Sequence, residues 1–115
     1  MDKRVTIHQK LLDAMHNAYL KAAEDYPGLA DFSKNVYFQA PQHIDYPAIV
    51  YERSSGNDLY ADGNPYRFEY TYTITIIDTD PDSYIPDQVA MLPKSRYIRH
   101  YVADNLHHDV FEIFY

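Results

Sequence analysis

The chain has 115 residues with 10 Lys or Arg and 17 Asp or Glu, which gives a formal net charge of −7. This length predicts one domain spanning residues 1–115, because domains typically run to roughly 100–200 residues. The acidic balance argues against a protein that binds nucleic acid by neutralising phosphates. Since cysteine is absent, a disulfide framework, a thiolate nucleophile and a cysteine zinc site are excluded.

Other classes are disfavoured because their patterns are missing. The 3 glycines form neither G-x-G-x-x-G nor G-x-x-x-x-G-K, so the common nucleotide-binding enzymes are not expected. No apolar run approaches the roughly 20 residues that cross a bilayer, and no apolar h-region follows the first four residues. We therefore expect neither membrane association nor a signal peptide.

The N-terminal segment, residues 4–25, is the clearest predicted helix. Its apolar residues recur at helical spacing and form one stripe: Leu11, Met15, Ala18 and Ala22. Pro27 disfavours helical geometry at the residue before it, and Gly28 permits a positive φ. The helix is therefore expected to end before Pro27.

Two short strands and a loop are predicted next. Residues 36–40 and 46–52 are rich in aromatic and β-branched side chains and are bounded by prolines, which is typical of strands. Residues 54–65 are polar and rich in turn formers, so they are expected to form the longest loop of the chain. Loops of this length are often functional.

Residues 66–77 carry the strongest pattern in the sequence. Tyr66, Phe68 and Tyr70 begin a series of apolar residues that alternates with polar ones to residue 77. This period of two predicts a long strand with one apolar and one polar face. At about 3.3 Å per residue it would reach about 40 Å, so part of it is expected to project or bend.

The C-terminal part is predicted to contain a helix and a hairpin. After an acidic turn at 78–83, Ile85, Val89 and Leu92 mark a short helix, capped by Asp82 or Ser83. Strands at 96–102 and 110–115 would form an antiparallel hairpin. The predicted fold class is α+β, a mainly antiparallel sheet with the long N-terminal helix and the second short helix packed on one face.

Two groups of residues invite a metal interpretation. His100, Asp104, His107, His108 and Asp109 have side chains that suit zinc or iron, but no H-E-x-x-H accompanies them, and a polar hairpin tip is the alternative.

The second group is an acidic run, Asp78, Asp80 and Asp82, that resembles the start of a calcium loop. However, the positions that need Gly and Glu hold Ser83 and Val89, so turn formation is favoured.

The sequence also lacks the patterns of nucleophilic catalysis. Neither G-x-S-x-G nor S-x-x-K occurs, and no pair among the 17 acidic residues stands out as catalytic. We therefore expect no enzyme activity, no catalytic residues, no resident metal and no cofactor.

Charge and tyrosine content instead indicate contacts with other chains. Lys94, Arg96 and Arg99 form a local basic cluster, and the 78–87 segment is acidic. These segments are either solvated surface or the two sides of a head-to-tail contact between subunits. The 13 tyrosines exceed what a small core needs, and tyrosine is enriched at protein interfaces.

Five segments of the sequence resemble the tail terminator, or tail completion, proteins of long-tailed bacteriophages and prophages. They are residues 36–41, 46–51, 60–64, 66–77 and 99–111. The resemblance covers most of the chain, in the same order of helices and strands. Other phage neck proteins, such as head-completion, stopper or connector proteins, share this size and composition.

The resemblance implies a virion protein at the head–tail junction, present in the host cytoplasm during assembly. Such proteins form rings, typically hexameric, that cap the major tail tube protein, stop tail polymerisation and allow joining to head-completion and neck proteins. DNA passes through the ring, and the charge of −7 would let it pass without specific binding. A small acidic partner-binding module and a metal-dependent enzyme are the alternatives.

We expect the contacts to subunits and partners to come from three places. The residues concerned are Tyr60 and Asp62 in the 54–65 segment, Asp78, Asp80 and Asp82 in the acidic turn, and Arg96 and Arg99 in the basic cluster.

Overall fold

A computed structural model describes residues 3–61 and 64–114, with side chains described for residues 5–54 and 70–114. The elements in chain order are α1 (Lys3–Asp25), β1 (Val36–Phe38), β2 (Ala48–Ala61), β3 (Asn64–Asp78), α2 (Ile85–Ala90), β4 (Ser95–Ala103) and β5 (Leu106–Phe114). The strands form one sheet in the order β1-β2-β3-β5-β4. Only β1 and β2 pair in parallel within the described sheet.

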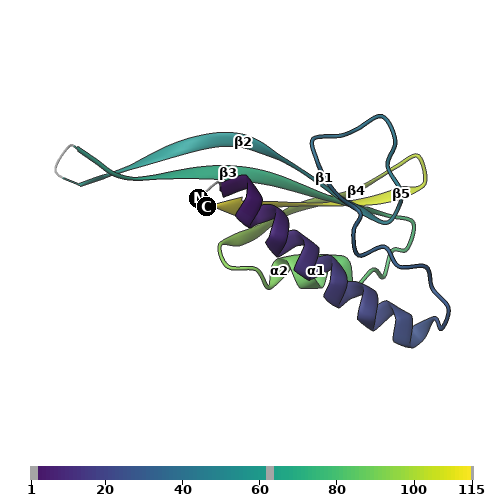
Figure 1. The fold of residues 1–115 in the computed structure, drawn as a ribbon. Helices are drawn as coiled ribbons and strands as arrows, with labels where there is room; N and C mark the ends of the chain where they lie inside the picture. Colours follow the sequence, from purple (N-terminus) through teal and green to yellow (C-terminus); the bar gives the residue numbers. More distant parts are fainter. Residues whose placement is uncertain (1–2, 62–63, 115) are drawn as a thin grey trace.

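The architecture is α+β with two layers. Helices α1 and α2 lie against the same face of the sheet, which we call the inner face, and they leave the outer face uncovered by helices (Figure 1). The predicted fold class, with both helices on one face of a mainly antiparallel sheet, is therefore confirmed.

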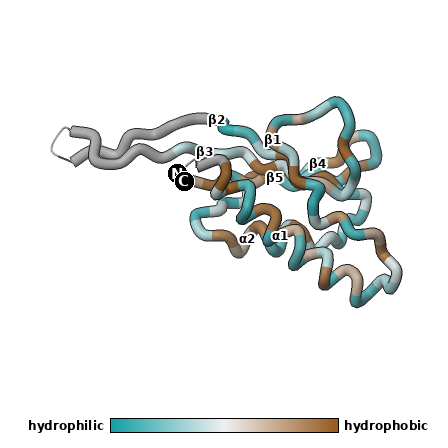
Figure 2. Tube along the Cα trace, in the orientation of Figure 1, coloured by the Kyte–Doolittle hydropathy of each residue, from teal (hydrophilic) through white to brown (hydrophobic). Residues whose placement is uncertain are grey.

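The core forms where the stripe of α1 meets the inner face of the sheet. Helix α1 contributes residues that are at most 4 % exposed, at the spacing of one helical face: Ile7, Leu11, Ala14, Met15 and Ala18. Tyr72, Ile74 and Ile76 of β3 are buried opposite them, because alternate residues of a strand share a face. Hydrophobic residues gather where α1, α2 and β5 come together (Figure 2).

Helix α1 and the last hairpin follow the predictions closely. The helix ends at Asp25, and Gly28 has a φ of +87°, as expected for the stop signal. Strands β4 and β5 form the antiparallel hairpin, in which Asp104 and Asn105 adopt positive φ values of 53° and 62° at the turn. Asp and Asn tolerate this geometry better than most residues, so the turn is tight and β5 begins earlier than predicted, at Leu106.

The prediction of a long loop at residues 54–65 is wrong. Strand β2 continues to Ala61 and pairs with β3 as far as Ala61 and Asn64. Ladder hydrogen bonds come from the backbone, so a polar sequence extends a strand when its neighbour is a strong strand former. The dipeptide Asp62-Gly63, a preferred two-residue hairpin turn, was the available sequence signal.

The expected cap of the second helix is also corrected. Tyr84 occupies the N-cap of α2 and makes no side-chain capping hydrogen bond. The Ser83 hydroxyl instead accepts a 3.2 Å hydrogen bond from the Ile85 N–H. Ser83 therefore lies one residue before the N-cap position. The predicted inward residues are confirmed, since Ile85 and Val89 are buried and Leu92 packs against the core.

The outer ends of β2 and β3 extend beyond the rest of the sheet as a two-stranded ribbon. Strand β5 reaches β3 only as far as Thr71, and β1 reaches β2 only as far as Tyr51. We call residues 54–61 with 64–70 the hairpin arm, which projects from the sheet in Figure 1. The arm makes the molecule elongated, with extents of 56 × 26 × 24 Å and a radius of gyration of 15.4 Å, against about 13 Å for a compact domain of this length.

None of the helices in the described part of the chain combines the length and the hydropathy needed to cross a membrane.

The packing of α1 predicts a large difference between two leucines of the same helix. Leu11 is fully buried, whereas Leu20 is 48 % exposed. We expect Leu11→Ala to lower the free energy of unfolding by about 2–5 kcal/mol, because it leaves a cavity in the core. Leu20→Ala is the control, with an expected change within about 0.5 kcal/mol. Urea unfolding followed by circular dichroism measures both, and equal midpoints would contradict this description of the core.

Candidate interaction surfaces

Strand β4 is an exposed edge of the sheet. It pairs only with β5 among the described strands, and all its residues after Ser95 are exposed. Four of them are large and apolar: Tyr97, Ile98, Tyr101 and Val102. A long edge strand with exposed apolar side chains is uncommon in a monomer, because its unpaired backbone groups and side chains favour pairing with another chain.

A bulge in β4 brings two arginines to the same face. Arg96 pairs with Glu112 and Arg99 with Val110, so one residue between them, Ile98, is extra in the register. Residues three apart in a regular strand lie on opposite faces, but the extra residue puts Arg96 and Arg99 on the same, outer face. We call Arg96, Ile98 and Arg99 the basic bulge.

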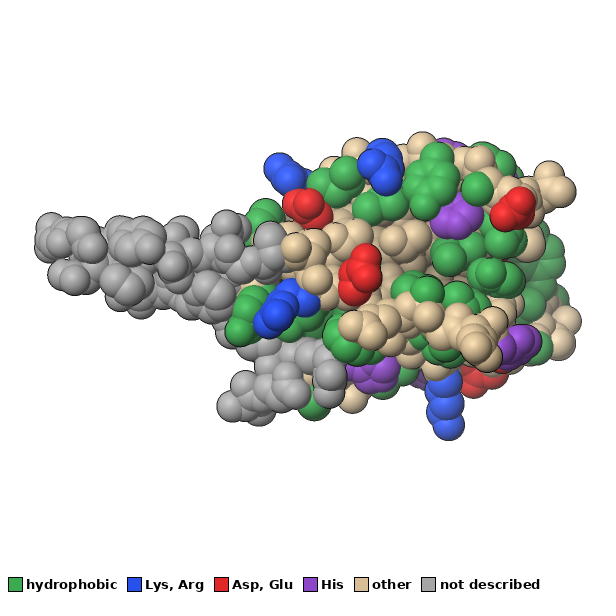
Figure 3. All heavy atoms as spheres, turned by 90° about the horizontal axis from the view of Figure 1, so that it is seen from above, with side chains coloured by type: hydrophobic (Ala, Val, Ile, Leu, Met, Phe, Trp, Pro, Cys, Tyr) green, Lys and Arg blue, Asp and Glu red, His purple; other side chains and the backbone are tan. Residues whose placement is uncertain are grey.

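Both arginines are held in place without being buried. Arg96 forms an ion pair with Glu112, at 2.8 Å between Nη2 and Oε2, and its side chain remains 64 % exposed. The Arg99 guanidinium lies 5.5 Å from the centre of the Tyr101 ring. Figure 3 views the outer face and shows basic side chains standing out along its edges, with acidic side chains interspersed. The basic bulge is therefore a local feature within a mixed surface.

The acidic run forms turns rather than a calcium loop. The carboxylate Oδ1 of Asp78 accepts a 3.0 Å hydrogen bond from the Asp80 N–H, and Oδ1 of Asp80 accepts a 2.9 Å bond from the Asp82 N–H. These are the turn contacts that Asp side chains commonly make with the backbone two residues on. The prediction of turn formation is confirmed, and we call residues 78–82 the acidic turn.

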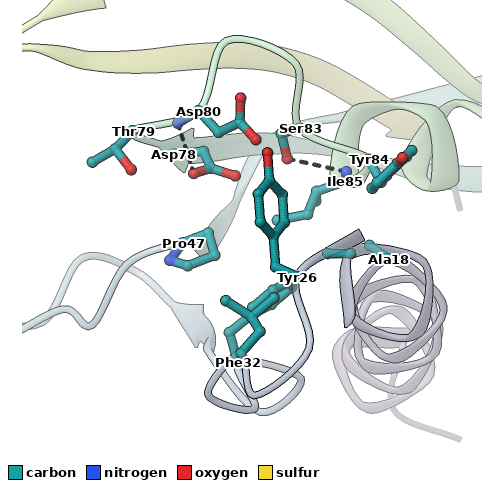
Figure 4. A pocket seen from close by; sticks show the side chains of 12 residues that line it. Ala18, Tyr26, Phe32, Pro47, Asp78, Thr79, Asp80, Ser83, Tyr84 and Ile85 are labelled. Carbon is teal, nitrogen blue, oxygen red and sulfur yellow. Dashed lines mark hydrogen bonds between the residues drawn. The ribbon is translucent and has the colours of Figure 1, made fainter. Parts of the chain in front are cut away.

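The acidic turn forms the rim of a pocket on the inner side of the sheet. The cavity has a volume of about 310 Å³, and its apolar lining includes Ala22, Leu29, Phe32, Pro47 and Ile85. Figure 4 shows the Tyr26 ring standing across this space, with its hydroxyl directed toward the acidic turn. The pocket thus combines an apolar floor with a negatively charged mouth.

The end of α1 adds to the negative charge at this pocket. Glu24 and Asp25 close the helix, and its last turn contains no basic residue. The carboxyl end of a helix carries a partial negative charge, which is normally balanced by cations. The Tyr84 hydroxyl donates a hydrogen bond to Oδ2 of Asp25 and joins this helix end to the start of α2.

The histidines of the last hairpin form pairs. The rings of His100 and His107 stack, with Nε2 and Nδ1 3.2 Å apart, and His108 stacks on Tyr101. The described side chains contain no group of three or more His, Asp or Glu residues arranged to hold a metal ion. The cluster predicted from the sequence is thus divided between the two faces of β5, because neighbouring residues of a strand point in opposite directions.

The structure therefore brings together some of the predicted contact residues. Asp78 and Asp80 line the pocket, and Asp82 follows them in the same turn. Arg96 and Arg99 share the basic bulge. The backbone of Tyr60 belongs to β2, although its side chain is outside the described part, and Asp62 lies outside the described residues.

Two residues that complete these surfaces, Ile98 and Tyr26, have no distinctive signal in the sequence. Ile98 stands out only once the register of β4 and β5 is known, and no local pattern announces a bulge. In the sequence, Tyr26 is only the residue before Pro27 in the helix stop signal. Its 61 % exposure next to a turn that contains Pro27 and Gly28 becomes meaningful when the acidic turn is seen to lie opposite.

The acidic turn and the basic bulge lie far apart on the same molecule. Asp78 follows Ile76 by two residues on β3, so it belongs to the inner face of the sheet. Arg96 lies on the outer face, where it pairs with Glu112, and Glu112 pairs in turn with Thr73 of β3. Thr73 precedes Asp78 by five residues, which is about 17 Å along the strand. The two surfaces are therefore on opposite faces and displaced along the sheet, so they are placed for contacts with different molecules.

Comparison of the sequence with models of known protein families and with curated proteins found no match.

Two tyrosines near these surfaces predict a pH dependence of stability. The hydrogen bond to Asp25, followed by its negative charge, raises the pKa of Tyr84. Desolvation, followed by the hydrogen bond to Asp109, raises the pKa of Tyr97. Each phenol therefore keeps its proton to higher pH in the folded chain than in the unfolded chain, where tyrosine titrates near about 10. Their contribution is fully present below pH 10 and is lost as the pH rises through the folded pKa.

We expect the unfolding midpoint in urea to fall as the pH rises above about 10. The decline should be shallower in the variant Tyr84→Phe with Tyr97→Phe, which cannot titrate at these positions. The variant Tyr26→Phe is the matched control, because Tyr26 is 61 % exposed and takes part in neither of these two hydrogen bonds, and it should follow the wild type. Equal slopes for all three proteins would contradict the raised pKa values.

Proposed function

We propose that this chain is a structural subunit of a phage tail, a tail terminator that caps the tail tube as an oligomeric ring. The observation that carries the proposal is the hairpin arm. A terminator of this kind stops polymerisation of the tube and leaves a surface for head joining. The role requires contacts between subunits and with the tube, and no catalytic group.

The arm supports assembly because it is incomplete alone. Its strands pair only with one another beyond Thr71, so each has an edge without a partner among the described strands. A two-stranded hairpin is at best marginally stable in water without further packing. The alternating aromatic residues of its sequence, Tyr66 and Phe68, are typical of a strand that packs against another surface.

The charges support a head-to-tail arrangement. The basic bulge and the acidic turn have opposite charge and lie on opposite faces of the sheet. A contact between two unlike surfaces repeats from copy to copy, and it closes into a ring when the rotation between copies permits. The net charge of −7 fits a ring through which DNA passes, since phosphates would be repelled rather than held.

A shortened arm tests the proposal. In the variant, Asn-Gly replaces residues 56–70 and joins Ser55 to Thr71, which are register partners. Most of the core lies outside this segment, so we expect the variant to fold. The wild type should cap polymerising tail tube protein from the same phage and give tubes of restricted length, as seen by electron microscopy. The variant should leave tube length unrestricted.

The control keeps the full arm and every predicted contact residue, and carries only the exposed α1 substitution Leu20→Ala. This control should behave as the wild type does. A folded short-arm variant that still caps tubes would contradict the role of the arm. A wild type that binds head-completion protein but leaves tube growth unchanged would place the chain in another layer of the neck.

A further inference from the structure

The pocket behind the acidic turn has the chemistry to receive part of the basic bulge from another copy. This inference rests on the proposed function, since it names the contact that would join neighbouring subunits. The pocket needs an apolar side chain to fill it and positive charge to balance its rim. The basic bulge supplies both, because Ile98 is apolar and Arg96 and Arg99 are cationic.

The pocket has room for a side chain. Its volume of about 310 Å³ is roughly twice that of a 150 Å³ apolar cavity that accepts benzene. Phe32 and Ile85 belong to its floor and are themselves buried, so the floor is part of the core and is preformed. Burial of an aliphatic side chain against such a floor is favourable because it removes apolar area from water.

The charges around the mouth select a cationic partner. Asp78 and Asp80 lie on the rim, and the carboxyl end of α1 brings Glu24 and Asp25 close by without a basic residue in its last turn. The exposed ring of Tyr26 stands across the opening, where its face can contact a guanidinium group (Figure 4). The acidic turn, the end of α1 and the Tyr26 ring would each stabilise an arginine side chain at the mouth of the pocket.

The basic bulge presents the complementary set. Ile98 is 38 % exposed at the edge of the sheet. Tyr97 and Tyr101, its exposed aromatic neighbours, are already engaged with Phe111 and His108 of the same chain. Bulges commonly redirect a side chain at a sheet edge, and the extra residue of this bulge is Ile98, which precedes Arg99 in the chain.

The basic bulge cannot reach the pocket of its own chain. The bulge faces outward at one end of β4, whereas the pocket opens on the inner side near the end of β3. We propose that Ile98 of one copy enters the pocket of the next copy, with its two arginines facing the acidic turn and the end of α1. The contact is heterologous, so each copy uses its bulge toward one neighbour and its pocket toward the other.

Two variants test this contact, each with changed charges on one of the two surfaces. The bulge variant is Arg96→Glu with Arg99→Glu, and the rim variant is Thr79→Lys with Asp82→Lys, which keeps the turn acceptors Asp78 and Asp80. Each variant alone should be monomeric by light scattering. An equal mixture should give a heterodimer that grows no further, because one intact bulge then meets one intact pocket.

A single substitution tests the apolar part. Ile98→Asp should weaken self-association at least about tenfold, as expected for a central interface residue. Val102→Asp on the same strand is the matched control, since Val102 is 56 % exposed but outside the bulge. Circular dichroism establishes that each variant is folded. At millimolar concentration, amide shifts of the wild type should change on dilution at residues of the bulge and the pocket.

The outcomes separate this contact from the proposed function. Three results would overturn the contact. They are unchanged assembly in the bulge variant and the rim variant, a mixture of the two that fails to dimerise, and dilution shifts absent from both surfaces. Variants that lose this contact and still cap tail tubes would retain the proposed function without it. A wild type that assembles through the bulge and pocket but leaves tube growth unchanged would keep the contact and overturn the function.

Discussion

The alternation of side chains along β3 is the constraint on which the rest of the structure depends. The strand pairs with both β2 and β5, and its inner-face residues Tyr72, Ile74 and Ile76 are buried under α1. A slip of one residue would turn this whole set toward the outer face, so the register is strongly specified. The same register determines where β5 stops at Thr71 and the arm begins, and it places Asp78 on the inner side, at the mouth of the pocket.

Strong periodicity made most of the fold predictable from the sequence, whereas pairing between distant segments made the rest inaccessible. The helix stripe of α1, the long strand and the final hairpin all depend on local patterns. The extension of β2 through residues 54–61 depends on its partner strand, and its polar composition is typical of a loop when read alone. The acidic turn and the two arginines were predicted as contact residues, but the bulge that aligns the arginines is a property of the β4–β5 register. The pocket likewise combines segments from four separate parts of the chain.

The tyrosines divide between the core and the surface. Tyr51 is 1 % exposed and its hydroxyl lies 2.8 Å from Nδ1 of His8, and Tyr72 is 3 % exposed. The hydroxyl of Tyr51 thus has a polar partner, as buried tyrosines usually do. Tyr26 and Tyr46 are 61 % and 46 % exposed. A tyrosine on the surface contributes a large rigid area at small entropic cost. For contacts at the pocket, the position of Tyr26 therefore matters more than the total number of tyrosines.

The arm and the bulge-and-pocket contact would constrain assembly in different ways. A single side chain in a pocket fixes a point between two copies but leaves rotation about that point, so by itself it allows both rings and open filaments. An arm that reaches about 25 Å past the sheet adds a second point of contact at a distance, and two separated points fix the angle between neighbours. A fixed angle is what closes a heterologous contact into a ring. A two-stranded arm has marginal stability alone. If it packs against a neighbour in the proposed ring, stabilisation of the arm and closure of the ring would be coupled steps.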